Sequence, residues 1–277
     1  MDFSRLNGRL LPLCLLLSLC TCDRAQNPPD VPPPSPLARA QTVAAIFAHP
    51  DDETTVAPLL ARLAREGKTV HLIITTDGRY GATDHGGIPA GDSLVAVRRE
   101  ELICSAAALG IEPPVQYDGK DMLGSNEGMD EFFTQLIGME DALEATLDSL
   151  RPDAVITFGA DGDSGHPDHR LTADVVTELL LSGKLPFQPH LYYFSYTREQ
   201  ADRYGADWNL NYADPRNLTE RWSFTPADAD RYYAAIHCHE SQYSAAERAA
   251  WIELERANPD PTIYLRPLVI PERVVRY

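Results

Sequence analysis

The sequence is poor in cysteine and in basic residues, and both shortages exclude classes of protein. Its 277 residues include five cysteines, and 24 Lys and Arg stand against 41 Asp and Glu, a formal net charge of −17. Such an acidic chain is poorly suited to bind the backbone of a nucleic acid, because the negative phosphates attract positive side chains. No Cys-x-x-Cys pair is present to form a thiolate zinc site. Only Cys104 and Cys238 lie beyond residue 22, and we expect buried free thiols rather than a disulfide.

Two glycine signatures are also missing. No Gly-x-Gly-x-x-Gly follows the first expected strand, where a dinucleotide-binding oxidoreductase requires it. No Gly-x-Ser-x-Gly elbow is present, so Ser164 and Ser241 are not expected to be serine-hydrolase nucleophiles. Hydrophobic residues amount to 44% and charged residues to 23%, as in a globular protein. These proportions exclude wholesale disorder and a multi-span membrane protein.

The first 22 residues have the pattern of a secretory signal. Arg5 and Arg9 precede an apolar run over residues 10–20. This run is too short to cross about 30 Å of hydrocarbon as a helix. Cys20 or Cys22 is a candidate for lipidation, as in a bacterial lipoprotein, with simple secretion or an uncleaved anchor as the alternatives. We therefore expect an exported protein, periplasmic or extracellular, that is either free or tethered to a membrane by an N-terminal lipid.

Residues 23–41 are predicted to be a linker rather than part of the fold. Six prolines lie within residues 27–36. Such a density of proline is incompatible with a helix or a central strand and favours an extended spacer. We therefore predict a single folded domain over residues 42–277.

Strands and helices alternate along that domain. Apolar runs and periodicity predict strands at 42–48, 69–76, 114–117, 153–158 and 190–194, and helices at 57–66, 93–109, 129–150, 171–181, 227–240 and 245–257. Strands separated by helices imply crossover connections and hence an α/β fold with a mostly parallel sheet flanked by helices. The tail from residue 262 is expected to add an edge strand.

Polar residues gather where the first and fourth expected strands end. Ala48-His-Pro-Asp-Asp-Glu53 follows the first strand, and Gly165-His-Pro-Asp-His169 follows the fourth. Sites in parallel sheets lie beyond the carboxyl ends of the strands, and imidazole and carboxylate are the usual ligands of a catalytic zinc ion. Each Asp alone could simply cap a helix. The occurrence of His-Pro-Asp at two strand ends favours a metal site.

These motifs resemble those of the zinc-dependent N-acetylglucosaminyl deacetylase family named for PIG-L and LmbE. Three supporting stretches are similar to the family as well: Thr76-Asp-Gly78, Arg98-Arg-Glu-Glu-Leu102 and His239-Glu-Ser-Gln242. The resemblance extends over about residues 43–242. It implies a Rossmann-like fold and hydrolysis of an acetamide, usually on an amino sugar.

The family's pattern implies a set of metal ligands. His49, Asp52 and His169 would bind Zn²⁺ and leave one position open for water. Zinc lowers the pKa of such a water molecule from 15.7 to about 7 and polarises the amide oxygen. Ligand types alone do not exclude Fe²⁺, Co²⁺ or Mn²⁺, because geometry and availability decide selectivity.

The pattern also implies catalytic roles for three further residues. Asp51 would be the general base that deprotonates the water. His166 would stabilise the oxyanion or donate a proton to the leaving amine, and Asp51 could instead return that proton. Asp168 would orient a histidine, with His166 as the first candidate.

Substrate contacts are predicted at two positions, each with a structural alternative. Arg98 would contact substrate, or form a surface ion pair with Glu100 or Glu101. Asp118 would hold sugar hydroxyls, or be the turn residue of Asp118-Gly119. The aromatic residues between 193 and 225 could stack on sugars, although packing of a lobe is the preferred interpretation.

The sequence thus predicts an exported zinc hydrolase that removes an N-acetyl group from a small amino sugar or glycoconjugate. The alternatives are an amidase of a thiol conjugate or acylated antibiotic, and a catalytically silent carbohydrate-binding protein. The acidity of the chain makes a neutral or cationic sugar a better partner than a polyanion. The sequence makes no prediction of oligomeric state.

Overall fold

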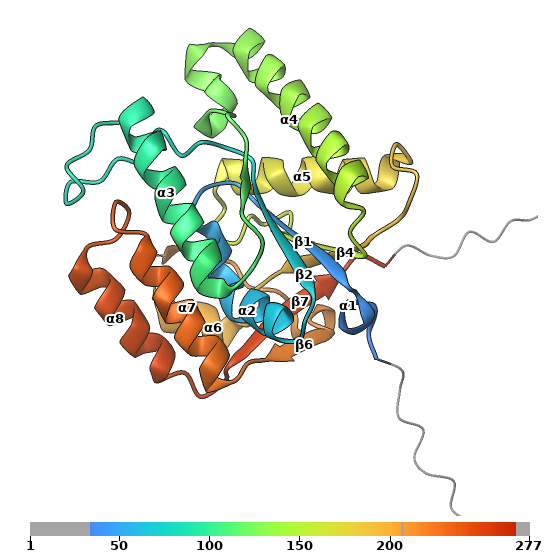
Figure 1. Cartoon of the computed structure of the whole chain (residues 1–277), viewed down its shortest axis with the longest axis vertical. Helices are drawn as coiled ribbons and strands as arrows, with labels where there is room; N and C mark the ends of the chain where they lie inside the picture. The colour runs from blue at the N-terminus through green and yellow to red at the C-terminus, as the bar shows by residue number, and fades with distance from the viewer. Residues whose placement is uncertain (1–33, 206–207, 270–277) are drawn as a thin grey trace, which may run out of the picture. The chain divides into compact units, whose positions relative to one another are not determined.

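The computed structural model describes residues 34–205 and 208–269 (Figure 1). The predicted signal, the lipidation candidates Cys20 and Cys22, and most of the predicted linker lie outside these residues. None of the helices in the described ranges combines the length and apolar character needed to cross a bilayer.

A seven-stranded mixed sheet runs through the described residues in the order β3-β2-β1-β4-β5-β7-β6. Its strands are β1 (Thr42–Phe47), β2 (Thr69–Ile74), β3 (Val115–Gln116), β4 (Ala154–Thr157), β5 (His190–Phe194), β6 (Glu220–Ser223) and β7 (Thr262–Pro267). The first five strands pair in parallel, whereas β7 is antiparallel to both β5 and β6. The predicted α/β fold with a mostly parallel sheet is confirmed.

The order of strands reverses direction at β1. The chain proceeds from β1 to β2 and β3 on one side, then returns to place β4 and β5 on the other. In such a sheet a crevice opens beyond the carboxyl ends of the two strands that flank the reversal. These are β1 and β4, the strands that precede the two His-Pro-Asp motifs.

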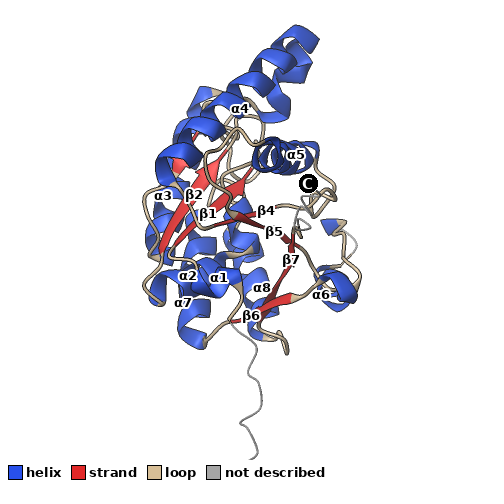
Figure 2. Cartoon of the chain, turned by 90° about the vertical axis from the view of Figure 1, so that its right-hand side faces the viewer, coloured by secondary structure: helices blue, strands red, loops and turns tan. Residues whose placement is uncertain are grey.

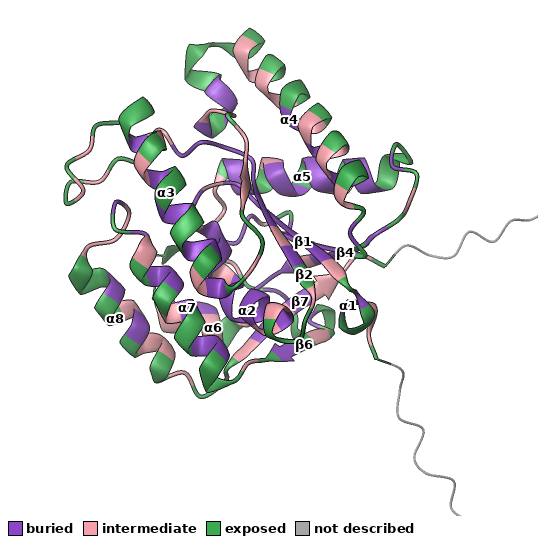
Figure 3. Cartoon of the chain, viewed as in Figure 1, coloured by how far each residue is buried: buried purple, intermediate pink, exposed green. Residues whose placement is uncertain are grey.

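Helices cover both faces of the sheet (Figure 2). They are α1 (Pro36–Arg39), α2 (Ala57–Arg65), α3 (Asp92–Leu109), α4 (Met129–Leu150), α5 (Pro167–Ser182), α6 (Arg198–Tyr204), α7 (Pro226–Cys238) and α8 (Ala245–Arg256). Alternate residues of β1 pack into different clusters, because successive side chains of a strand point to opposite faces. Phe47 joins the cluster with α2, α3 and α7, whereas Ile46 joins the cluster with α4 and α5. Figure 3 shows the buried residues along the strands and the inward helix faces.

The folded unit begins before the predicted boundary at residue 42. Helix α1 lies within the predicted linker, with Ser35 as its N-cap and Pro36 in its first turn. Leu37 is fully buried, and its backbone N–H donates a hydrogen bond to the Tyr192 hydroxyl at 3.0 Å. The linker prediction over 23–41 is therefore corrected at its end, because one apolar residue after the prolines packs into the core.

The prediction for the tail is also wrong in one respect. Strand β7 lies between β5 and β6 and is not an edge strand. The edge is β6, a segment that sequence analysis did not predict as a strand. Trp222 of β6 is 5% exposed and belongs to the hydrophobic core cluster on one face of the sheet.

The two expected free thiols form a disulfide instead. Cys104 of α3 and Cys238 of α7 are bonded, with their Cα atoms 5.7 Å apart. The two helices lie side by side on the same face of the sheet (Figure 1). Because the cysteines are 134 residues apart in the sequence, local patterns could not show this proximity.

Candidate active site

The loop after β1 presents the first motif in a constrained conformation. His49 follows the strand, and Asp52 begins a short 3-10 helix, Asp52–Thr55. Asp51 precedes this helix with φ 114° and ψ −24°, a backbone conformation that few non-glycine residues adopt. Such outliers persist only where surrounding contacts hold them. The outlier occurs at the residue expected to act as general base.

The loop after β4 presents the second motif on the first turn of α5. This helix begins at Pro167, four residues earlier than the predicted start at residue 171. The His166 ring is its N-cap, since Nδ1 accepts a hydrogen bond from the Asp168 backbone N–H at 3.2 Å. Asp168 and His169 therefore project from the same helical turn toward the end of β1.

The three predicted metal ligands converge. Asp52 Oδ2 lies 3.3 Å from His49 Nδ1, and Asp52 Oδ1 lies 3.2 Å from His169 Nε2. The Asp52 carboxylate is further fixed by the backbone N–H of His49 at 2.6 Å. The two imidazoles thus each lie within ion-pair distance of one oxygen of the same carboxylate.

The outer nitrogens of both imidazoles contact other carboxylates. His49 Nε2 lies 3.0 Å from Asp168 Oδ2, and His169 Nδ1 lies 2.8 Å from Asp163 Oδ1. Such contacts orient metal-binding histidines and fix their tautomers. Asp168 therefore orients His49 rather than His166, whose Nδ1 is 4.0 Å from Asp168 Oδ2, and this corrects the predicted partner. Asp163 was not predicted at all, because its loop position gave no motif.

These contacts determine the protonation of the site. Burial by itself lowers the pKa of His49, but the charge of Asp52 and the hydrogen bond to Asp168 outweigh it and raise this pKa to about 9. The pKa of His169 rises against the same desolvation to about 11, owing to Asp52 and Asp163. The two imidazoles hold the pKa of Asp52 well below its ordinary value despite burial. Without a cation, both rings carry protons that a bound cation would displace.

The donor set fits a divalent cation such as Zn²⁺, which favours histidine nitrogen and carboxylate oxygen. A second possible ligand set shares two residues with the first. His49, His166 and His169 each offer a nitrogen, and these atoms lie within 4.8 Å of one another. Asp52 is the better third ligand, because both its oxygens already face the inner nitrogens. The His166 side chain is 42% exposed and its Nδ1 is engaged by the Asp168 N–H.

Asp51 lies beside this cluster with its own electrostatic environment. Burial raises its pKa, the positive charge of Arg98 opposes this, and the Asp52 charge adds to the rise, so that the pKa reaches about 6. Arg98 Nη2 lies 3.3 Å from Asp51 Oδ1. A carboxylate with this pKa is suited to accept and return a proton near neutral pH.

Arg98 is not the exposed residue that a surface ion pair would require. Its side chain is 4% exposed, and its guanidinium donates to the backbone oxygens of Pro50 and Gly78. The alternative of a surface pair with Glu100 or Glu101 is therefore wrong. Arg98 lines the cleft, and its contacts are with the Asp51 loop and with the loop after β2 that carries Gly78.

A cleft of about 320 Å³ opens over the cluster. It is lined by His49, Asp51, Asp52, Tyr80, Gly81, Arg98, Asp121, Met122, His166, Asp168, Gln242 and Tyr243. Asp118 is not among these residues, which corrects its predicted role: its carboxylate is 91% exposed and pairs with Arg99 at 3.0 Å. Asp121 occupies the cleft instead, held by the backbone N–H groups of Gly78 and Tyr80.

The other supporting motifs contribute to the wall of the cleft. Gln242 lines it directly, whereas Ser241 is bound by the buried Glu101 at 2.6 and 2.7 Å. Among the predicted aromatic residues, Trp222 is buried, as the packing interpretation requires, whereas Trp208 and Tyr212 are 42% and 48% exposed. Tyr80, 39% exposed at the cleft, was not predicted.

Fold and site together define an α/β protein with a mostly parallel sheet and a cluster of histidine and aspartate side chains beyond the ends of β1 and β4. The chain belongs to the PIG-L family, whose model, described as GlcNAc-PI de-N-acetylase, matches residues 44–180. It is 31% identical over 239 residues to the 1D-myo-inositol 2-acetamido-2-deoxy-alpha-D-glucopyranoside deacetylase of Mycolicibacterium gilvum, covering 73% of this chain and 80% of that relative. Further relatives with the same name match over 46–57% of their length.

Solved structures agree with this fold. The N,N'-diacetylchitobiose deacetylase from Pyrococcus horikoshii is similar with a TM-score of 0.61 and 19% identity, over 84% of this chain and 85% of that chain. The 4-carboxy-2-hydroxymuconate hydratase from Pseudomonas putida is similar with a TM-score of 0.58 and 15% identity, over 83% and 97%. Because a deacetylase and a hydratase share the fold, the reaction must be argued from the site.

Proposed function

We propose that this protein hydrolyses the acetamide of a small N-acetylated amino sugar or glycoconjugate. The observation that carries the proposal is the position of Asp51, a carboxylate with raised pKa, beside a converged His49, Asp52 and His169 at the floor of an open cleft. A silent carbohydrate-binding protein has no need for this combination of base and ligand set.

The proposed reaction combines a cation with the residues of the cleft. A divalent cation held by His49, Asp52 and His169 would polarise the amide carbonyl and lower the pKa of a water molecule toward neutrality. Asp51 accepts a proton from the attacking water, whose oxygen bonds to the carbonyl carbon. The C–N bond then breaks, the nitrogen takes up a proton, and acetate and a free amine are the products.

The structure favours separate tasks for Asp51 and His166. Burial, with the charges of His49 and His169, lowers the pKa of His166, so its ring is neutral near pH 7. Because Nδ1 accepts the Asp168 N–H, Nε2 carries the proton and can donate a hydrogen bond to the oxyanion. Asp51, with a pKa of about 6, is the better group to return a proton to the leaving amine.

A substrate screen tests the proposal. Purified protein loaded with Zn²⁺ should release acetate from N-acetylglucosamine, N,N'-diacetylchitobiose or an N-acetylglucosaminyl inositol, measured together with the free amine formed. An N-acetylated thiol conjugate and an acylated glycopeptide antibiotic serve as competing substrates. If only one of the competitors were turned over, that compound would replace the amino sugar as the proposed substrate. If sugars bound but no acetate were released, the proposed hydrolase activity would be rejected.

We also propose that the protein is exported. The charged and apolar pattern of residues 1–22 supports export, and so does the Cys104–Cys238 disulfide, because disulfides persist mainly in oxidising compartments. Expression in a bacterial host with a labelled lipid precursor should mark a mature chain that starts at Cys20 or Cys22. A mature chain that carries no label and starts beyond Cys22 would indicate export without a lipid anchor. A chain that keeps Met1 and stays in the cytoplasm would reject export.

A further inference from the structure

A buried carboxylate next to the site has no part in the proposed chemistry. Glu53 is fully buried, directly follows the ligand Asp52, and does not line the cleft. Its Oε2 accepts the backbone N–H of Asp51 at 3.0 Å. Glu53 thus accepts a hydrogen bond from Asp51, the residue with the unusual backbone angle φ 114°. An anchor at this N–H opposes relaxation of the loop to a more common conformation.

Two donors hold the other oxygen of Glu53. Ser105 Oγ and His239 Nε2 contact Oε1, and the His239 distance is 2.7 Å. Ser105 lies on α3, and His239 is the C-cap residue that directly follows α7. The Asp51 loop is therefore attached, through one carboxylate, to two helices that are distant in the sequence.

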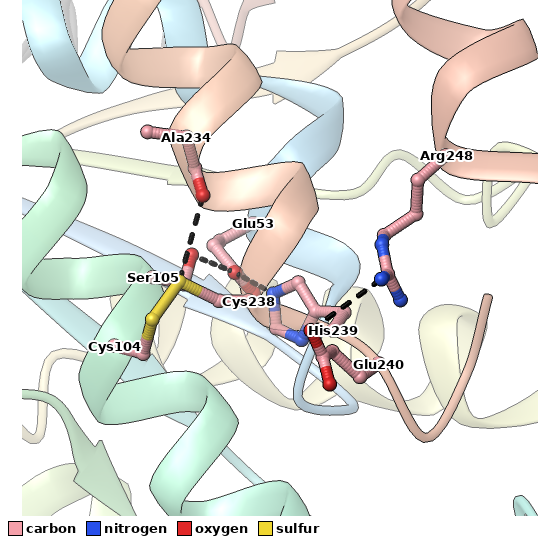
Figure 4. Close-up of a disulfide and its surroundings, with 8 residues drawn as sticks. All are labelled: Glu53, Cys104, Ser105, Ala234, Cys238, His239, Glu240 and Arg248. Atoms are coloured by element: carbon pink, nitrogen blue, oxygen red, sulfur yellow. Dashed lines mark hydrogen bonds and ion pairs between the residues drawn. A yellow bond between two sulfur atoms is a disulfide. The ribbon is translucent and has the colours of Figure 1, made fainter. Parts of the chain in front are cut away.

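The disulfide joins the same two helices at the adjacent residues. Cys104 immediately precedes Ser105, and Cys238 immediately precedes His239 (Figure 4). Each donor to Glu53 is thus the chain neighbour of one half of the disulfide. Separation of the two helices by about half an ångström or more would take one or both hydrogen bonds out of the usual range of about 2.5–3.2 Å.

Helix α3 also contributes a direct contact to Asp51. Arg98, on the same helix as Ser105 and Cys104, pairs with the Asp51 carboxylate at 3.3 Å. The backbone and the carboxylate of Asp51 are consequently both positioned relative to α3. The disulfide fixes α3 to α7, which supplies His239.

We propose that Glu53 is a positioning residue for Asp51 and that the Cys104–Cys238 disulfide holds its two donors in register, so that the oxidised protein is the fully active form. This inference rests on the proposed function and adds a redox dependence to it. A dithiol reductant supplies two electrons and two protons, opens the disulfide to two thiols, and itself becomes a cyclic disulfide. The helices remain packed through their apolar faces, so the reduced protein stays folded with a less ordered Asp51.

The test compares oxidised protein, reduced protein and the Cys104→Ser/Cys238→Ser variant, all loaded with Zn²⁺ and assayed with N,N'-diacetylchitobiose. We expect kcat to fall about tenfold to a hundredfold on reduction, because misplacement of a catalytic group by about 1 Å has effects of this size. KM and the zinc content should stay unchanged. The double variant should match the reduced protein and not respond to reductant, which controls for removal of zinc by the dithiol. A double variant with the kcat of the oxidised protein would overturn the proposal.

A second set of variants separates positioning from general stability. In Asp51→Asn the residual activity should not change on reduction, because the group that the disulfide positions is already lost. Glu53→Gln, which keeps an oxygen for the Asp51 N–H, should retain more kcat than Glu53→Ala. An equal loss on reduction in wild type and in Asp51→Asn would show a purely structural disulfide and reject the inference.

One readout does not depend on turnover. Hydrogen exchange at the Asp51 amide should be faster in the double cysteine variant than in oxidised wild type, whereas amides of β1 should exchange equally in both. If no sugar were turned over but the Asp51 amide still exchanged faster in the double variant, the proposed substrate would be rejected and the positioning of Asp51 by Glu53 and the disulfide would stand. Equal exchange at Asp51 in both proteins would reject the positioning itself.

Discussion

Asp51→Asn should retain the metal and lower kcat by about 10²–10⁴-fold, the usual contribution of general acid–base catalysis. Asparagine has nearly the same shape and can still accept a hydrogen bond from Arg98, but it cannot take a proton from water. Elemental analysis should therefore find the same zinc content in variant and wild type. Acetate release provides the kinetic measurement.

The pH dependence of this variant gives a second check. A general base must be deprotonated, and the Asp51 pKa is raised to about 6, so wild-type kcat/KM should fall as the pH drops below about 6. With zinc in sufficient excess to keep the site loaded at each pH, the residual activity of Asp51→Asn should lack this acid limb. Asp148→Asn is a matched control, because its carboxylate is 51% exposed and pairs with Arg151 on the surface. An Asp51→Asn variant with most of its activity would show that another group is the base.

His49→Ala or Asp52→Ala should lose both the metal and the activity. Removal of His49 takes away one inner nitrogen and leaves Asp168 without its imidazole partner, and removal of Asp52 takes away the carboxylate that both imidazoles face. Zinc content after dialysis against a weak chelator is the measurement. His190→Ala, an exposed histidine at the start of β5, is the matched control and should keep zinc.

His166→Ala distinguishes the two possible ligand sets. If Asp52 is the third ligand, His166→Ala should retain zinc and lose turnover, because the ring then acts on the oxyanion. Loss of zinc in His166→Ala, with zinc retained in Asp52→Ala, would instead assign the set His49, His166 and His169.

The affinity for zinc should also depend on pH. The pKa values of His49 and His169 in the cation-free site are raised to about 9 and about 11, so both rings are protonated below pH 9. Because binding requires neutral imidazoles, each cation releases two protons, and the association constant should fall about a hundredfold for each pH unit below 9. Competition titrations with a chromophoric chelator between pH 6 and pH 8 measure this slope. A pH-independent constant would contradict the assigned protonation.

Several features of the fold and site could be predicted because their signals are local. Strand β5 and helix α4 have the predicted bounds, since apolar runs and helical periodicity lie within each segment. The two His-Pro-Asp motifs could be matched to strand ends for the same reason. Helix α5 was predicted to start too late, because the capping role of His166 depends on the direction of its ring.

Other features depend on residues that meet only after folding. Asp168 was assigned to the nearby His166, whereas the parallel pairing of β1 with β4 brings it to His49. Asp118 was chosen for its place after a strand, whereas the turn that follows brings Asp121 into the cleft. Sequence spacing alone does not distinguish such partners.

The sequence by itself therefore determined the class of fold, because this depends on local periodicity, and the resemblance of its motifs predicted the ligand types and Asp51 as the base. Only the tertiary structure decided that Cys104 bonds to Cys238, that Asp163 holds His169, and that Glu53 anchors Asp51. The disulfide depends on the packing of two helices whose cysteines are 134 residues apart, whereas the other two contacts depend on the conformation that a loop adopts in the folded protein. The physical reason is that hydrogen bonds and disulfides form only when the partner atoms lie within fractions of an ångström of the required distance. The packing of helices and loops on the sheet sets these distances.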